Sequence, residues 1–220
     1  MVEYAIDKHY DGIALSIAHP TRFTEVVNKA RNAGIPLIAF NMDSMETSRM
    51  AGVSQDFYKA GTEFGRRVID RLAHKSKVLA TMHDAGIPAL VERLRGISDV
   101  LSAKEIGINT IISGNTPQLA KDTILNNLTP DIDAVLCTGL SDTHGAGIAA
   151  TITGRRVYVA GFDICEEILT FIKSKIIDFS IDQQPYVQGF YPLLMMAQYR
   201  AMGVMPFDID TGCNIVDHVH

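Results

Sequence analysis

The residues of this chain that are best suited to chemistry are polar side chains at or just after the ends of predicted strands. They supply carboxylate, guanidinium and amide groups, but no nucleophile poised beside a base. The candidates are Asn41, Gln55, His83 or Asp84, Arg93, Asp163 and Gln183. In an open α/β sheet, ligands are held in a crevice at the carboxyl ends of the strands, so we expect these residues to converge there. The sequence therefore predicts a site for a hydroxyl-rich ligand such as a polyol.

The stretch 178–189 (DFSIDQQPYVQG) defines the position of Gln183. Phe179 and Ile181 alternate with polar residues as in a strand, and Pro185 ends the strand because it lacks an N–H group. Apolar residues at helical spacing follow, which predicts a helix from Pro185. Gln183 thus stands at a strand-to-helix corner, where its amide can donate to and accept from a hydroxyl-rich ligand. The alternative is a turn whose amides are only solvated.

Each candidate also has a simpler explanation when it is taken alone. An arginine in the first turns of a helix, such as Arg93, is usually solvated, and an aspartate after a strand, such as Asp163, often caps a helix. Ser141, Asp142 and His144 are neighbours in sequence, but a catalytic triad requires geometry that adjacency does not supply. We expect these three residues to open a helix.

Composition excludes several classes of protein. The 220 residues carry a net charge of -5 without any basic run, so nucleic acid is not an expected partner. The apolar segments have the length of strands, not of membrane spans, and the first seven residues are acidic where a secretory signal would be basic. Cys137, Cys165 and Cys213 are widely spaced and read as small core residues, so no zinc site is expected.

Strand-like and helical segments alternate throughout, which predicts an α/β protein with parallel sheets flanked by helices. A loop and then Gln55 and Asp56 follow the strand at 37–40, and a turn is expected at 208–212. Gly61 and Gly65 are four residues apart on one helix face and would permit a close helix contact. The predicted strands lie near 11–17, 37–40, 78–82, 108–112, 134–138, 157–160, 178–182 and 214–217.

A dinucleotide-dependent enzyme is one alternative, because Gly145 and Gly147 begin a Gly-x-Gly-x-x-Ala motif. The motif should open the turn directly after a strand, whereas seven residues separate Thr138 from Gly145. We therefore expect both glycines inside a helix, and we expect neither a cofactor nor an enzymatic activity.

The chain resembles the substrate-binding proteins of sugar ABC transporters, the ribose-binding-like branch of the periplasmic binding proteins with the type I fold. The resemblance spans nearly the whole chain, in the family's order. The matching stretches are DGIALS at 11–16, AGIPLI at 33–38, AGTEFG at 60–65, ERLRG at 92–96, DAVL at 133–136, VAGFD at 159–163 and DQQPYVQG at 182–189.

This resemblance implies two α/β lobes that are joined by three crossovers and close on a monosaccharide in the cleft between them. The lobes are expected at 1–54 plus 184–209 and at 55–183 plus 210–220. By position, Asp163 resembles the carboxylate that accepts from two sugar hydroxyls, Arg93 the guanidinium donor and Gln183 the hinge amide. Asn41 and Gln55 resemble contacts near the first crossover, and His83 and Asp84 lie in a loop that touches the sugar in relatives. A membrane permease and a periplasmic location are implied as well.

The sequence departs from the family in two places. Gly139 stands where relatives often carry an amide. The family's first lobe normally starts with a further βαβα stretch of about 60 to 70 residues, at about 30 per βαβ unit, that is missing here. An incomplete first lobe would leave strand edges unpaired, so we expect either a fragment or a chain that pairs with a second copy. The effector-binding part of a LacI-type transcription regulator is the alternative of similar fold.

Overall fold

Two sheets organise the chain in the computed structural model, which describes residues 1–219 and, of Pro20, only the backbone. Unit 1 comprises Met1–Asp56 and Gln184–Gly212, and unit 2 comprises Phe57–Gln183 and the residues from Cys213 on. The chain thus passes between the units three times. These borders lie within three residues of the expected lobe boundaries, and the assignment of the units to two hinged lobes stays a prediction.

Unit 1 is built on a parallel sheet of four strands in the order β1-β2-β3-β9. Alternate residues of β2 point to opposite faces. Ala39 packs with Val27 of α2 on one face, and Ile38 packs with Met195 and Met196 of α8 on the other. The elements are α1 (Val2–Asp7), β1 (Ile13–Leu15), α2 (Pro20–Asn32), β2 (Leu37–Asn41), β3 (Ala51–Ser54), α8 (Pro185–Met202) and β9 (Ile209–Asp210).

Strands β3 and β9 were not expected from the sequence, which predicted a loop and a turn at these places. A polar network accounts for β3. Gly52 donates its N–H to Oδ1 of Asp208 at 2.8 Å, and Arg49 bonds both Asp208, at 2.9 Å, and Asp43, at 2.5 Å. A side chain at Gly52 would collide with Asp43. The strand forms because of these distant partners, since four residues with a glycine carry little intrinsic strand preference.

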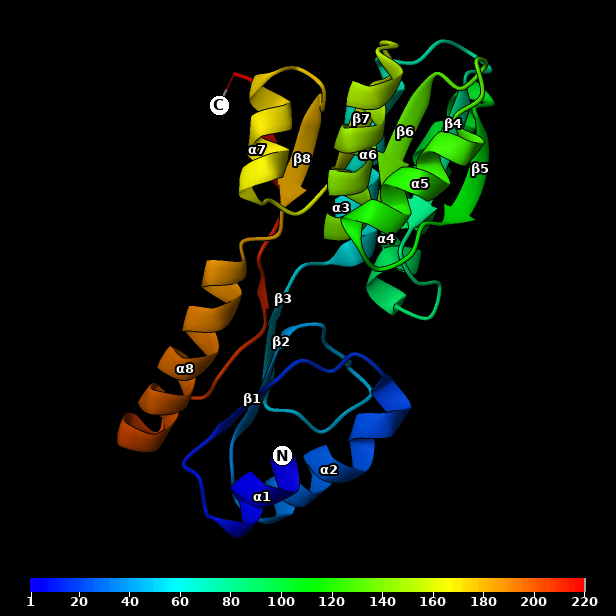
Figure 1. Ribbon diagram of the computed structural model, residues 1–220. Coiled ribbons are helices and arrows are strands. Elements are labelled where there is room, and N and C mark those ends of the chain that lie inside the picture. The colour runs from blue at the N-terminus through cyan, green and yellow to red at the C-terminus, as the bar shows by residue number, and fades with distance from the viewer. Residues whose placement is uncertain (220) are drawn as a thin grey trace. The chain divides into compact units, whose positions relative to one another are not determined.

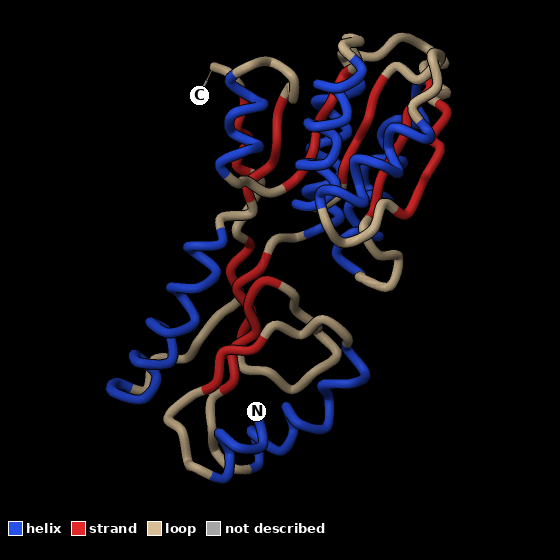
Figure 2. The backbone as a smooth tube through the Cα atoms, in the orientation of Figure 1, coloured by secondary structure: helices blue, strands red, loops and turns tan. Residues whose placement is uncertain are grey.

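Unit 2 is built on six strands in the order β10-β8-β7-β6-β4-β5, of which β10 alone is antiparallel to its neighbour. Figure 2 shows the strands in red and the helices in blue. This arrangement confirms the predicted parallel sheet. Its elements are α3 (Phe57–Ile69), β4 (Lys77–Met82), α4 (Pro88–Leu101), the short 3₁₀ helix η1 (Ser102–Lys104), β5 (Gly107–Ile112), α5 (Pro117–Asn127), β6 (Ala134–Cys137), α6 (Leu140–Thr153), β7 (Tyr158–Phe162), α7 (Glu166–Lys173), β8 (Phe179–Asp182) and β10 (Asn214–Asp217).

Both faces of this sheet are buried, as Figure 1 shows for the helices packed along it. Leu136 of β6 packs with α3 and α4, whereas its neighbour Val135 packs with α5, α6 and α7. On the first of these faces the ring of Phe64 stacks on that of Phe162, with centroids 5.1 Å apart and planes at 8°. This packing places α3 and α4 beside the end of β7.

Helices α3 and α4 approach each other closely through glycines, as expected for Gly61. A Cβ atom on Gly61 would lie 2.1 Å from the carbonyl oxygen of Arg93, and one on Gly96 would lie 2.3 Å from that of Tyr58. Both distances are far below van der Waals contact, so only glycine fits at either position. The contact fixes the position of α4, and with it Arg93, against α3.

Gly145 and Gly147 lie inside α6, which confirms that they do not form a strand-end phosphate loop. A Cβ on Gly145 would lie 2.6 Å from Cβ of Ala120 in α5, and one on Gly147 would overlap the ring of Phe171 in α7. These glycines serve helix packing. The helices opened by Leu140 and by Pro185 are also present, as predicted.

Helix α8 presents an apolar face that is not buried within the described residues. Tyr186, Phe190 and Leu193 are 83%, 50% and 61% exposed, whereas Met195 and Met196 pack on the sheet. The helix is present as predicted, but these exposed apolar residues are not the ones that pack on the sheet. None of the described helices is long and apolar enough to cross a membrane.

Candidate functional site

Three of the predicted site residues are joined by hydrogen bonds at the carboxyl ends of strands in unit 2. Gln183 donates from Nε2 to Oδ1 of Asp163 at 2.6 Å. Its Oε1 accepts from Nη2 of Arg93 at 3.4 Å, and Nη1 of Arg93 donates to the carbonyl of Thr138 at 2.9 Å. The ends of β6, β7 and β8 and the first turns of α4 thus supply one connected polar group.

Asp163 is held in a backbone conformation that few residues other than glycine adopt. Its φ is 69°, in the left-handed region, where aspartate and asparagine are tolerated better than most side chains. Its N–H donates to the carbonyl of Ile181 at 2.8 Å, and its carbonyl accepts from Oγ of Ser180 at 2.7 Å. Strand β8 therefore fixes the residue in this conformation, which is a pattern typical of functional sites.

Arg93 is 3% exposed, so the expectation that an arginine in the first turns of a helix is solvated is wrong here. The guanidinium lies 4.3 Å from the ring centroid of Phe162 and 5.4 Å from that of Phe57. Burial lowers the pKa of Arg93, although Asp163 and Asp142 oppose this shift. The planar guanidinium can stack on these rings and still donate from its edge.

The Asp163 carboxyl has a pKa above its ordinary value. Burial is the main cause, and Arg93 and the hydrogen bond from Gln183 only partly offset it. A carboxylate in this environment is stabilised by further hydrogen-bond donors. Ligand hydroxyl groups would supply them, since a carboxylate can accept several hydrogen bonds. The arrangement therefore suits a neutral ligand with adjacent hydroxyl groups.

His83 lies beside the same group, next to a residue that the sequence did not single out as a ligand contact. Asp142 stands in the first turn of α6, as expected, but its side chain is 0% exposed. Its Oδ2 accepts from Oγ1 of Thr81 at 2.7 Å and from the N–H of Thr138 at 2.9 Å. Thr81, a polar residue in an otherwise apolar strand, was the available signal in the sequence.

The other predicted residues have less direct links to this group. Asp84 is exposed, and its Oδ1 accepts from the N–H of Gly86 at 2.7 Å. Asn41 ends β2 in unit 1 with a φ of 60°. Gln55, also in unit 1, is 2% exposed and donates to the carbonyl of Gly212 at 2.8 Å. Their roles toward a ligand stay predictions.

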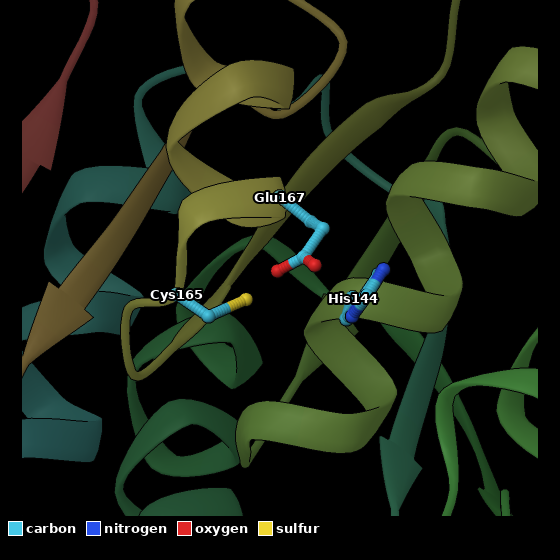
Figure 3. Close-up of side chains that lie close together, drawn as sticks. All are labelled: His144, Cys165 and Glu167. Atoms are coloured by element: carbon cyan, nitrogen blue, oxygen red, sulfur yellow. The ribbon is translucent and has the colours of Figure 1, made fainter.

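One group of side chains has the composition of a metal site. His144 on α6 and Cys165 and Glu167 at the start of α7 point toward one another, with possible ligand atoms within 4.8 Å (Figure 3). Glu167 is already satisfied, because a hydrogen bond from its own backbone N–H and then one from the Cys165 thiol lower its pKa. Burial raises the pKa of Cys165, which disfavours the thiolate that a metal needs.

Comparisons with known proteins show the family of the chain. Residues 1–203 match the periplasmic binding protein domain family. The xylose/arabinose-binding protein XylF of Sulfolobus acidocaldarius is 28% identical over 98% of this chain and 58% of its own length. The ribose import binding protein RbsB of Bacillus subtilis is 25% identical over 86% of this chain and 62% of its own length. The chain thus spans about three fifths of these curated relatives.

Solved structures confirm the fold class. A solute-binding protein of an ABC transporter from Agrobacterium vitis, with bound D-fucose, superposes with a TM-score of 0.92 at 22% identity and covers 100% of this chain and 79% of that one. A carbohydrate transporter protein from Acidothermus cellulolyticus, in complex with myo-inositol, gives 0.88 at 25% identity, with 100% and 78% covered. From its sequence match and its two α/β units, the chain belongs to the periplasmic binding protein family.

Proposed function

We propose that this chain binds a small sugar, a monosaccharide or a related polyol, through Arg93, Asp163 and Gln183. The observation that carries the proposal is the hydrogen-bonded series from Arg93 through Gln183 to Asp163 at the strand ends of unit 2. The relatives named for xylose, arabinose and ribose support a sugar as the ligand class.

Each group has a distinct part in this binding. Asp163 accepts from two ligand hydroxyls, and Arg93 donates to a ligand oxygen from its buried, stacked position. Gln183 orients the Asp163 carboxylate from one side. Hydrogen bonds that involve a charged group are the stronger ones, so they fix which hydroxyl pattern is accepted. Asn41, Gln55, His83 and Asp84 are proposed as further contacts.

The bound sugar is delivered to the membrane permease of an ABC transporter, and the chain acts in the periplasm. Support comes from the family and from a relative named as an import binding protein. Capture of a solute outside the membrane requires no chemistry on the ligand, in agreement with a set of polar groups that holds no poised nucleophile.

The sugar can be identified by its effect on thermal unfolding. A ligand at one hundred times its Kd stabilises a protein by about 2.7 kcal/mol, which is a rise in Tm of roughly 5 to 10 °C for a chain of this size. Because the chain has no tryptophan, an external dye is the suitable reporter. We expect one or a few of the pentoses, hexoses and inositols to raise the Tm. The absence of a rise with every sugar at millimolar concentration would contradict the proposal.

We also propose that the chain pairs with a second copy through unit 1. Strand β1 is the outer strand of its sheet within the described residues, and α8 exposes Tyr186, Phe190 and Leu193. An unpaired strand edge and an exposed apolar face each favour association. Size-exclusion chromatography with light scattering should show a dimer that Leu193→Glu converts to a monomer. A stable monomer of the unmodified chain would contradict this part of the proposal.

A further inference from the structure

Asp142 is a buried carboxylate with one oxygen fully engaged and the other not. Its Oδ2 accepts hydrogen bonds from Oγ1 of Thr81 and from the N–H of Thr138. Thr81 lies in β4, and Thr138 directly follows β6, which pairs with β4. Its Oδ1 is buried and has no hydrogen-bond partner among the described residues. The two bonds to Oδ2 fix the orientation of the carboxylate, so Oδ1 faces a set direction.

The group that Oδ1 faces is the imidazole of His83. Nδ1 of His83 lies 3.9 Å from Oδ1 and is likewise buried, with no hydrogen-bond partner in the part of the chain that the structure describes. The His83 side chain is 23% exposed. Because Nδ1 is buried, the exposed area belongs to the other atoms of the side chain. His83 therefore turns one nitrogen to Asp142 and keeps another part of its side chain accessible.

Gly139 provides the space for this pair. A Cβ atom at that position would lie 3.1 Å from Nδ1 of His83 and 3.3 Å from Oδ1 of Asp142. Both distances are tighter than most contacts of real Cβ atoms, so a larger residue would push the two groups apart. The space that a side chain at Gly139 would fill is thus bordered by the His83 ring and the Asp142 carboxylate.

We propose that Asp142 is a positioning residue that holds His83 as a cationic donor to a ligand oxygen. This inference rests on the sugar-binding function proposed above. With Nδ1–H directed at Asp142, Nε2–H of the imidazolium donates a charge-assisted hydrogen bond to the sugar. Once the ring loses its Nε2 proton, Nε2 can only accept. Sugar affinity then depends on the protonation of His83.

The charged groups around His83 favour the imidazolium. Asp142 of α6 interacts with it most strongly and raises its pKa, partial burial opposes this, and Asp84 and Asp163 add to the rise. Arg93 of α4 is the positive group of the same cluster, and it interacts with Asp142 and Asp163. Since the pKa is raised, the cation persists to higher pH than for a free histidine. Within the pH range in which Asp163 is ionised, sugar affinity should be full where His83 is protonated and should fall as the pH rises through the pKa of His83.

Titration of the His83 ring by NMR tests the pair without any sugar. The His83 signals are assigned by their loss in His83→Gln. Asp142→Asn keeps the shape and the acceptor for Thr81 but removes the charge, so the His83 midpoint should move to lower pH. Gly139→Ala, which separates the pair, should act in the same direction. Glu105→Gln is the control. It removes an exposed carboxylate that lies 3.7 Å from a different histidine, His74, and it should leave the His83 midpoint unchanged. An unchanged midpoint in Asp142→Asn and in Gly139→Ala overturns the inference.

Calorimetry of sugar binding across the same pH range tests the role toward the ligand. In the unmodified chain the affinity should fall about fivefold to tenfold above the His83 midpoint, since a charge-assisted bond is replaced by a weaker one. In Asp142→Asn this fall should occur at lower pH. Binding that is strong but independent of pH overturns the inference and leaves the proposed function intact. Absence of binding at every pH contradicts the proposed function and the ligand role of His83 together.

Discussion

Gln183 and Asp163 are twenty residues apart in sequence, yet Nε2 of the glutamine donates to Oδ1 of the aspartate at 2.6 Å. The bond determines how the amide is oriented, since its oxygen must then face the Arg93 guanidinium, from which it accepts at 3.4 Å. The amide therefore links the anion and the cation of the site. Removal of this link should affect both.

Gln183→Ala should weaken sugar binding more than it weakens folding. The variant removes the amide that orients the Asp163 carboxylate, and so weakens the hydrogen bond from a ligand hydroxyl to that carboxylate. A hydrogen bond to a charged group contributes about 1.5 to 3 kcal/mol. The expected loss of affinity is therefore roughly 10-fold to 150-fold, measured by isothermal titration calorimetry. Gln118→Ala, an exposed amide in the first turns of α5, is the matched control and should bind as the unmodified chain does. Equal affinities of both variants would contradict the role of Gln183.

Asp163→Asn should stabilise the ligand-free chain at neutral pH although it removes a proposed ligand contact. Because the folded-state pKa of Asp163 is raised, ionisation of this group costs stability, and the cost grows as the pH rises from the unfolded pKa through the folded one. Asparagine avoids this cost and tolerates the positive φ of the site. Urea denaturation at pH 4 and at pH 7 should show a stability gain that is larger at pH 7. A gain that shrinks as the pH rises would contradict the raised pKa.

Arg93→Met should destabilise the chain, and the loss should depend on Asp163. Without the guanidinium, Asp163 has lost the charge that most opposes the effect of its burial, so its ionised form destabilises the fold further. Protonation of Asp163 relieves this cost, so the loss should be smaller at pH 5 than at pH 8. The double variant with Asp163→Asn should recover much of it, as urea denaturation can measure. Strictly additive effects of the two single substitutions would show that the two groups are not coupled.

Gly61→Ala should disturb the site from a distance. The added methyl group meets the Arg93 carbonyl oxygen at 2.1 Å, so α3 and α4 must separate. Forcing extra volume into a packed contact costs about 1 to 3 kcal/mol, and it displaces Arg93 as well. Gly189→Ala is the control, because that glycine lies within α8 and a Cβ there would meet no atom within 4 Å.

The two glycine variants should therefore have opposite effects on thermal stability. Alanine at position 189 should be neutral or stabilising by up to about 1 kcal/mol through helix propensity. Alanine at position 61 should lower the Tm and weaken sugar binding. If Gly61→Ala retains both, α3–α4 packing does not set the position of Arg93.

The layered fold could be predicted from the sequence because its signals are local. Runs such as residues 77–82 and 134–137 are apolar on both faces, as strands between two helix layers must be. The strand-end rule also indicated Arg93, Asp163 and Gln183, which the structure joins by hydrogen bonds. No homologous structure was needed to expect polar groups at these ends.

Other features depend on contacts that the sequence does not display. The burial of Arg93 requires Phe57 and Phe162 from two other elements, and Asp142 faces His83 only because α6 packs beside the end of β4. Strand β3 forms through bonds from Asp208, which is 156 residues from Gly52. Such contacts join residues that are far apart in the sequence, so local sequence patterns do not predict them.

The central claim is that Arg93, Gln183 and Asp163 form a sugar site, and calorimetric titration of a sugar panel into the unmodified chain and Asp163→Asn tests it most directly. We expect saturable binding of at least one pentose, hexose or inositol by the unmodified chain, and a loss of about 2 to 5 kcal/mol of binding free energy in the variant. Binding of that sugar with equal affinity by both proteins, or no binding of any sugar, would contradict the claim.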